Sequence, residues 1–134
     1  MPFDLRDTTQ LFPSASGFLG VLESPELPFN PSRFYWIHSV PMGASRGNHA
    51  HKNLNQFFVA LKGSVSIEIS DSNSTSLVTL ADSSKILVLE AGLWRRLFDF
   101  SDDAVILVGA DSNYDATDYI HDWEEYLSWR EINV

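Results

Sequence analysis

The sequence predicts a small all-β protein, a sandwich or barrel of short strands with one short helix at its C-terminal end. Three observations favour this fold class. Short runs rich in β-branched and aromatic residues follow one another from residue 34 to residue 109. Turn-forming residues separate these runs, and no helical pattern falls between them. The 134 residues are 44% hydrophobic, enough to bury one core, so we expect residues 1–134 to form a single domain.

The expected strands are short, and one of them shows its two faces clearly. In residues 65–70, Val65, Ile67 and Ile69 alternate with polar residues, which is typical of a strand with one buried and one solvated face. The Ser/Asn-rich stretch 70–76 reads as a hairpin loop. The expected strands, in chain order, are 34–40, 56–61, 65–70, 77–80, 86–89, 93–100 and 104–109.

The single expected helix covers residues 121–129. Asp122 and Glu125 have the spacing of a capping box, with Asp as the cap. Apolar residues recur at intervals of three and four, as on one face of a helix: Trp123, Tyr126, Leu127 and Trp129.

Composition excludes several classes of function. The chain has no cysteine, so it has no disulfide, no zinc-thiolate site and no thiol nucleophile. The start has neither the basic nor the apolar region of a secretory signal, and the longest apolar stretch, 104–110, is far below the roughly 20 residues of a membrane-spanning helix. We expect a cytoplasmic protein that does not enter a membrane.

The net charge of −9 is distributed unevenly along the chain. Residues 1–98 hold eight acidic and eight basic side chains, whereas residues 99–134 hold ten acidic residues and a single basic one, Arg130. The chain therefore lacks the broad basic surface that nucleic acids require, and we expect no nucleic-acid partner. A small anionic ligand stays compatible with local basic groups.

Two histidines carry the chemistry that the sequence suggests. His49 and His51 are separated by one residue, a spacing that in a strand directs both imidazoles to the same face. With Gly43, Gln56 and Gly63 they form the pattern G-x5-H-x-H-x4-Q-x6-G. This pattern resembles the first signature of the cupin superfamily, whose fold is a jelly-roll barrel, also called a double-stranded β-helix. In metal-binding cupins a Glu usually stands where this chain has Gln56.

The second cupin signature, roughly P-x-G-x2-H, is matched only in part. Gly92 is present, but Glu90 replaces the proline and Arg95 replaces the histidine. Two imidazoles, an amide and a permanent cation suit a divalent metal poorly. We therefore expect no metal and no other cofactor, and we expect the histidines to act in proton transfer, for which a pKa near neutrality suits them.

A closer resemblance extends over residues 33–127. The segment 46–52, RGNHAHK, is similar to the RGxHAHK motif of the cupin-type sugar 3,4-ketoisomerases that act on dTDP-4-keto-6-deoxyglucose. Residues 94–101 resemble the family's WHxxxDFS, and residues 114–122 resemble its YDExDYIRDY ending. The resemblance implies a metal-free isomerase of deoxysugar biosynthesis, with a dTDP-linked 4-keto-6-deoxy sugar as substrate. It also implies a homodimer with exchanged N-terminal strands.

Moving a carbonyl from carbon 4 to carbon 3 requires removal of the carbon 3 proton, an enediol, and return of a proton at carbon 4. Our hypothesis is that His51 is the base and that His49 relays or returns the proton. Arg46 and Tyr35 would orient the ketone and stabilise charge on its oxygen.

Further residues are candidates for the substrate site. Gln56 would present an inward amide, Trp94 would pack on a sugar or base ring, and Lys52 would lie near phosphate or cover the surface. Arg95 stands where the family's Trp-His pair has the histidine. If it points inward, it could pair with Glu90 or a pyrophosphate, and it would lower the pKa of nearby histidines. Arg95 and Arg96 alternate, so at most one faces the barrel. His38 and His121 are interpreted as structural.

Two other functions are compatible with these residues. A non-catalytic cupin that binds a sugar or nucleotide-sugar is favoured by Arg95. A metal-dependent dioxygenase or related cupin enzyme would need a bound iron, nickel or zinc ion.

Overall fold

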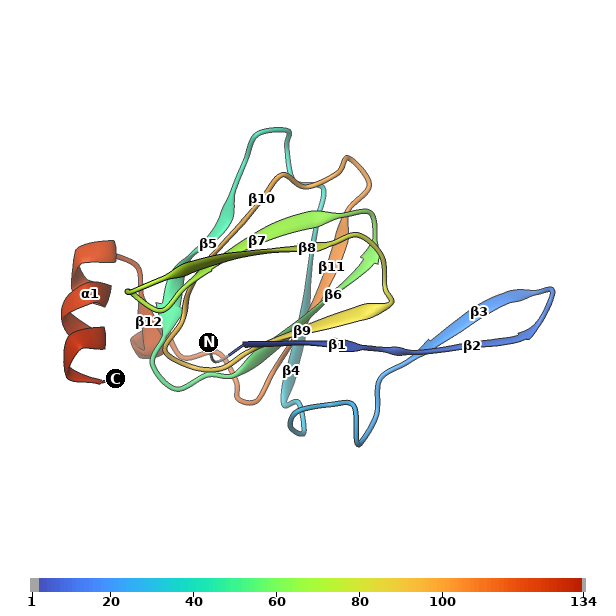
Figure 1. Ribbon diagram of the computed structural model, residues 1–134, viewed down its shortest axis with the longest axis horizontal. Helices are drawn as coiled ribbons and strands as arrows, with labels where there is room; N and C mark the ends of the chain where they lie inside the picture. Colours follow the sequence, from blue (N-terminus) through green and yellow to red (C-terminus); the bar gives the residue numbers. More distant parts are fainter. Residues whose placement is uncertain (1–2, 134) are drawn as a thin grey trace.

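The chain forms two facing antiparallel sheets and one C-terminal helix (Figure 1). The computed structural model describes residues 3–133. The strands are β1 (Phe3–Asp7), β2 (Thr9–Ser14), β3 (Gly17–Val21), β4 (Arg33–His38), β5 (Arg46–His51), β6 (Gln56–Lys62), β7 (Val65–Ser70), β8 (Thr75–Leu80), β9 (Lys85–Leu89), β10 (Trp94–Phe98), β11 (Val105–Ala110) and β12 (Tyr119–Ile120). The helices are the 3-10 turn η1 (Ala116–Asp118) and α1 (Trp123–Ile132).

The two main sheets have five strands each, and the core lies between them. Their orders are β1-β9-β6-β11-β4 and β12-β5-β10-β7-β8, so strands distant in sequence are neighbours. Alternate residues of each sheet face the core, for example Ile67 and Ile69 of β7, which are fully buried. The structure confirms the expected all-β fold with a short C-terminal helix.

The seven expected strands are all present, with ends that differ by at most two residues. The expected strand 65–70 is β7 with the same bounds. The N-terminal strands β1, β2 and β3 were not predicted, because residues 3–21 contain Pro, Gly, Ser and Thr without a clear apolar alternation. β2 and β3 pair only with each other and form a hairpin that projects from the body of the molecule (Figure 1).

Helix α1 begins two residues after the expected start at residue 121 and ends three residues after the expected end at residue 129. The Asp122 side chain accepts a hydrogen bond from the backbone N–H of Glu125 at 2.9 Å, which confirms Asp122 as the N-cap. Tyr126 is fully buried against Ala50 and Ile120, and its hydroxyl donates to the carbonyl of Gly92 at 2.8 Å. Within residues 3–133, no helix has the length and apolar character needed to cross a membrane.

Gly109 allows a close approach between two neighbouring strands. A Cβ atom at this position would lie 2.2 Å from the ring of Phe57 on β6, which is fully buried. We expect Gly109→Ala to lower the free energy of unfolding by about 1–3 kcal/mol, the usual cost of overpacking a core. Urea unfolding would measure this. Combined with Phe57→Leu, the glycine substitution should cost less than it does alone, and strictly additive costs would contradict the steric explanation.

Candidate active site

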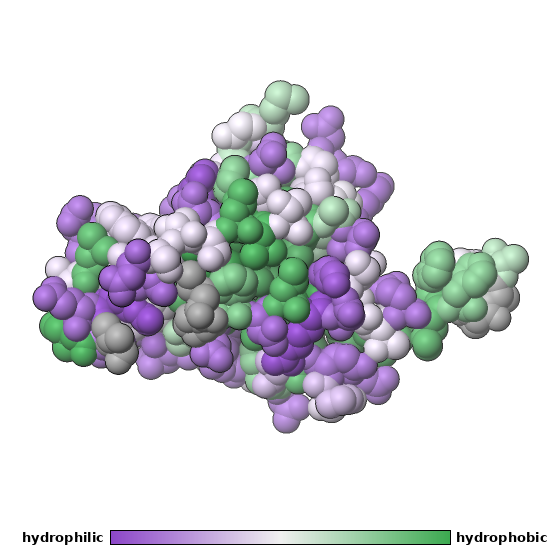
Figure 2. Space-filling view, viewed as in Figure 1, coloured by the Kyte–Doolittle hydropathy of each residue, from purple (hydrophilic) through white to green (hydrophobic). Residues whose placement is uncertain are grey.

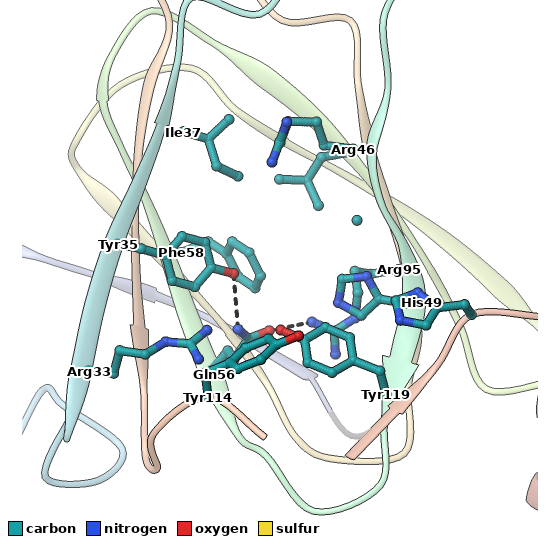
Figure 3. A pocket seen from close by; sticks show the side chains of 13 residues that line it. Arg33, Tyr35, Ile37, Arg46, His49, Gln56, Phe58, Arg95, Tyr114 and Tyr119 are labelled. Carbon is teal, nitrogen blue, oxygen red and sulfur yellow. Dashed lines mark hydrogen bonds between the residues drawn. The ribbon is translucent and has the colours of Figure 1, made fainter. Parts of the chain in front are cut away.

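A cavity of about 550 Å³ opens between the two sheets (Figure 3). Strands β4, β5, β6 and β10 supply most of its walls, and the segment that follows β11 closes one side. The residues that line the cavity are Arg33, Tyr35, Ile37, Arg46, Gly47, His49, Gln56, Phe58, Arg95, Leu97, Tyr114, Tyr119 and His121. Three of these residues are arginines and none is an aspartate or glutamate, so the cavity is positively charged although the protein is acidic overall.

The two histidines of β5 form a hydrogen-bonded chain that ends at a carboxylate. Nε2 of His49 lies 3.1 Å from Nε2 of His51, and Nδ1 of His51 lies 2.9 Å from Oδ2 of Asp118. Asp118 is held there because it is the last residue of η1 and directly precedes β12, which pairs with β5. His49 lines the cavity, whereas His51 is 1% exposed and lies behind it.

The surroundings of this pair oppose its protonation. Burial, followed by the charge of Arg95, lowers the pKa of His49 to about 2 and that of His51 to about 4. Asp118 acts in the opposite direction on His51, through its hydrogen bond and its charge. Both rings are therefore neutral at pH 7, which is the form of an imidazole that can accept a proton.

Arg95 is a buried cation at the floor of the cavity. It lies opposite His49 in the β5–β10 pairing and is 1% exposed. Its Nη1 donates to Oε1 of Gln56 at 2.5 Å, and its Nε and Nη2 donate to the carbonyl of Leu93 at 3.3 and 3.2 Å. Burial lowers the pKa of Arg95 to about 10, so the guanidinium stays charged at pH 7. It does not pair with Glu90, the carboxylate considered from the sequence.

Gln56 connects Arg95 to Tyr35 across the cavity. Its Nε2 donates to the Tyr35 hydroxyl at 3.1 Å, while its Oε1 accepts from Arg95 (Figure 3). Burial raises the pKa of Tyr35, so this phenol keeps its proton at neutral pH. The three hydrogen-bonded side chains of Arg95, Gln56 and Tyr35 therefore place one hydroxyl proton and one positive charge at the cavity, both suited to stabilise an oxyanion.

Most of the candidate residues from the sequence come together here. Five of them line the cavity: Arg46, Tyr35, His49, Gln56 and Arg95. Of the two histidines expected to act in catalysis, His49 lines the cavity, whereas His51 is buried and does not line it.

Two candidates lie elsewhere. Trp94 alternates with the inward Arg95, so it points to the other face of β10 and packs on Trp123 and Tyr126 of α1, with ring centroids 5.3 and 5.6 Å away. The same alternation confirms that only one of Arg95 and Arg96 faces the barrel. Lys52 is exposed and does not line the cavity.

Several residues in or next to the cavity were not singled out from the sequence. His121 was interpreted as structural, but it lines the cavity and stacks on Tyr119 with ring planes 8° apart. Asp118 and Tyr114 belong to the C-terminal motif that the family resemblance picked out, and this motif was the available signal. Arg33 is the first residue of the region that resembles the family, but it was not named as a site residue. Within residues 3–133, no group of three or more His, Cys, Asp or Glu side chains is arranged to hold a metal ion.

Comparison with known proteins gives a consistent result. The family model described as FdtA: WxcM-like, C-terminal, matches residues 4–131. The TDP-4-oxo-6-deoxy-alpha-D-glucose-3,4-oxoisomerase of Aneurinibacillus thermoaerophilus is 32% identical over 120 residues, covering 90% of this chain and 86% of the relative.

Solved structures of a sugar 3,4-ketoisomerase share the fold closely. QdtA from Thermoanaerobacterium thermosaccharolyticum, in complex with TDP, is 32% identical with a TM-score of 0.94, covering 98% of this chain and 96% of that one. A histidine-to-asparagine mutant of QdtA, in complex with TDP-4-keto-6-deoxyglucose, gives 31% identity and a TM-score of 0.93 over 98% of this chain and 95% of that one. The chain therefore belongs to the FdtA family, whose relatives of known structure and activity include sugar 3,4-ketoisomerases.

Proposed function

We propose that this protein is a sugar 3,4-ketoisomerase that converts dTDP-4-keto-6-deoxyglucose into its 3-keto isomer. The observation that carries the proposal is a neutral imidazole, His49, on the wall of a positively charged cavity. A second imidazole is hydrogen-bonded to it, a cation lies beside it on the neighbouring strand, and a phenol lines the same cavity. Relatives that cover nearly the whole chain carry out this type of reaction, which supports the same chemistry here.

The reaction follows from the arrangement of these groups. His49 takes the proton from carbon 3, and the electron pair left on that carbon forms an enediolate with the carbon 4 oxygen. Tyr35 and Arg95 stabilise the negative charge on that oxygen. The proton of the carbon 3 hydroxyl passes to the carbon 4 oxygen, so that the negative charge moves to the carbon 3 oxygen. The proton held by the histidines then adds at carbon 4, and the carbon 3 oxygen becomes the carbonyl. The base is thus His49, and His51 acts behind it, the reverse of the order expected from the sequence.

The charge of the cavity suits a nucleotide diphosphate. Arg33 and Arg46 lie on opposite walls, on β4 and β5, and each offers a guanidinium that can form two hydrogen bonds with phosphate oxygens. Tyr114 lines the same cavity and is 67% exposed, so its ring is available for stacking on a base. Arg33 already lies over the rings of Tyr35 and Tyr114, at 5.0 and 5.9 Å.

The direct test is incubation with dTDP-4-keto-6-deoxyglucose in deuterated buffer, followed by NMR. We expect signals of a 3-keto-6-deoxy product together with deuterium at carbon 3 or carbon 4. The depressed pKa values of both histidines also favour the alternative function, a non-catalytic protein that binds the nucleotide-sugar. Saturable binding with an unchanged ligand and no label would support that alternative and contradict the isomerase.

We also propose that the protein is a homodimer with exchanged N-terminal strands. The β2–β3 hairpin leaves the body of its own chain and carries an apolar surface (Figure 2). The exposed fractions of its large side chains are 58% for Phe12, 74% for Phe18 and 55% for Leu19. Phe34 and Trp36 on the edge strand β4 are also more than half exposed. An apolar surface of this kind is typical of a partner interface.

Replacing the two hairpin rings should weaken the dimer. Phe12 and Phe18 pack on each other with centroids 4.7 Å apart, and their area is buried only if a second chain covers it. We expect the Phe12→Ser/Phe18→Ser protein to have a dimer dissociation constant at least about tenfold higher in analytical ultracentrifugation, since two buried rings contribute well over 1.4 kcal/mol. Leu77→Ser is the matched control, because Leu77 is 63% exposed on β8, in the other sheet. A monomeric wild-type protein would contradict the proposal.

A further inference from the structure

Asp118 is a nearly buried carboxylate that only accepts hydrogen bonds. Its Oδ1 accepts from the backbone N–H of Asn53 at 2.7 Å, and its Oδ2 accepts from that of Leu54 at 3.3 Å. The third contact is the one with Nδ1 of His51, at 2.9 Å from Oδ2. Both backbone groups are donors, so the carboxylate is kept in its accepting form, and the facing nitrogen of His51 must be the one that carries a proton.

The hydrogen bond between Asp118 and His51 determines which ring nitrogens of His51 and His49 carry a proton. The pKa of His51 is lowered to about 4, so at neutral pH the ring has a single N–H. With that proton on Nδ1, Nε2 of His51 has a lone pair. The neighbouring Nε2 of His49, 3.1 Å away, must then be the donor.

We propose that Asp118 is a positioning residue that fixes the tautomers of both histidines, so that Nδ1 of His49 is the atom that accepts the substrate proton. This inference rests on the proposed function, since it names the accepting atom of the same base. His49 forms no other hydrogen bond within the part of the chain that the structure describes, so its Nδ1 lone pair is free for the ligand.

The hydrogen-bonded side chains of His49, His51 and Asp118 also stabilise the carbon 3 proton after His49 has taken it up. When Nδ1 of His49 gains the carbon 3 proton, its Nε2–H bond can break as a new bond forms to Nε2 of His51. The positive charge then lies on His51, next to the Asp118 carboxylate and farther from the cavity. Returning the proton to carbon 4 reverses these steps, so the three side chains end in their starting state.

Replacing one carboxylate oxygen of Asp118 with an amide nitrogen should reverse the direction of the hydrogen bonds between Asp118, His51 and His49. In the Asp118→Asn protein, the amide oxygen can still accept from Asn53, the shorter backbone contact, and the amide nitrogen then faces His51 as a donor. His51 would have to carry its proton on Nε2 and donate to His49, and His49 would carry its proton on Nδ1. The base then presents an N–H group to the substrate and has no lone pair there.

The test combines imidazole tautomers with activity. Long-range ¹H–¹⁵N NMR of ¹⁵N-histidine-labelled protein should show His51 protonated on Nδ1 and His49 on Nε2 in the wild type, and the opposite pattern in Asp118→Asn. We expect the isomerisation rate constant of Asp118→Asn to fall by about 10²- to 10⁴-fold, the usual contribution of a general base. The dissociation constant for dTDP should change less than about threefold.

Asp115→Asn is the matched control, because Asp115 is an exposed carboxylate three residues away whose cap on Thr117 an asparagine can also make. Its tautomers and rate should equal those of the wild type. Wild-type His51 protonated on Nε2 would overturn the inference, even if Asp118→Asn does not fold. Unchanged tautomers or a nearly unchanged rate in Asp118→Asn would do the same. Expected tautomers in a wild-type protein without isomerase activity would support the tautomer assignment and contradict the proposed function.

Discussion

Replacing His49 with asparagine is expected to lower the rate constant of isomerisation by about 10²- to 10⁴-fold, the usual loss when a general base is removed. Asparagine has an amide in place of the imidazole and cannot accept a proton near neutral pH. The neighbouring lining residues on β4, β6 and β10 are a phenol, an amide and a guanidinium, whereas the imidazole of His121 is stacked on Tyr119 with its ring centroid 5.9 Å from that of His49. The rate is measured by NMR on dTDP-4-keto-6-deoxyglucose.

The control for this prediction is His38→Asn. His38 is an exposed histidine at the end of β4 that contacts Ser39 and does not line the cavity. We expect His38→Asn to retain the wild-type rate and His49→Asn to retain the affinity for dTDP. If His49→Asn keeps more than a tenth of the wild-type rate, His49 is not the base.

The second large effect concerns stability at acid pH. The pKa of His51 is lowered to about 4 in the folded protein, whereas in the unfolded chain it has its ordinary value near 6.5. Between these two values the unfolded chain binds a proton that the folded protein does not bind, so the free energy of unfolding decreases as the pH falls. Above pH 6.5 the ring is neutral in both states and the shift has no effect, whereas between pH 6.5 and pH 4 it lowers the free energy of unfolding by about 3 kcal/mol for His51. His49, with a pKa of about 2, acts in the same direction.

Urea unfolding at a series of pH values from 7.5 to 4.5 would measure this loss. The matched variant is His49→Gln/His51→Gln, which removes both titrating rings and places amides at their positions. Its free energy of unfolding at pH 7.5 is expected to be lower, but it should decrease less steeply as the pH falls. Equal slopes for the variant and the wild type would show that the histidines are not responsible. The acidic residues 99–134 are present in both proteins, so their own titration cancels in the comparison.

Local patterns in the sequence were sufficient for much of the fold. The alternation in 65–70 predicted β7 with its bounds, and the Asp122–Glu125 spacing predicted the start of α1, because both signals depend on residues close together in the chain. Strands β2 and β3 lack such a signal. They pair only with each other, so no alternation between a core face and a solvent face is imposed on them.

The sequence pointed to five residues that line the cavity, but it did not show which of the candidates would face it. The spacing of His49 and His51 places both rings on one face, but which of them reaches the cavity depends on strands contributed from elsewhere. Asp118 is 67 residues from His51 in sequence, and only the pairing of β12 with β5 brings them together. From the sequence, Trp94 could lie on either face of β10. Because Arg95 points inward, the adjacent Trp94 points to the opposite face, where it packs on Trp123.

The charge of the cavity also bears on how a nucleotide-sugar arrives. At long range, a diphosphate dianion meets a protein with a net charge of −9 and is repelled. At physiological ionic strength that repulsion decays over a Debye length of about 8 Å, whereas the interaction with Arg33, Arg46 and Arg95 inside the cavity is screened much less. Collisions with the outer surface are therefore unproductive for most cellular anions, and an anion is retained only if its shape lets it enter between the sheets.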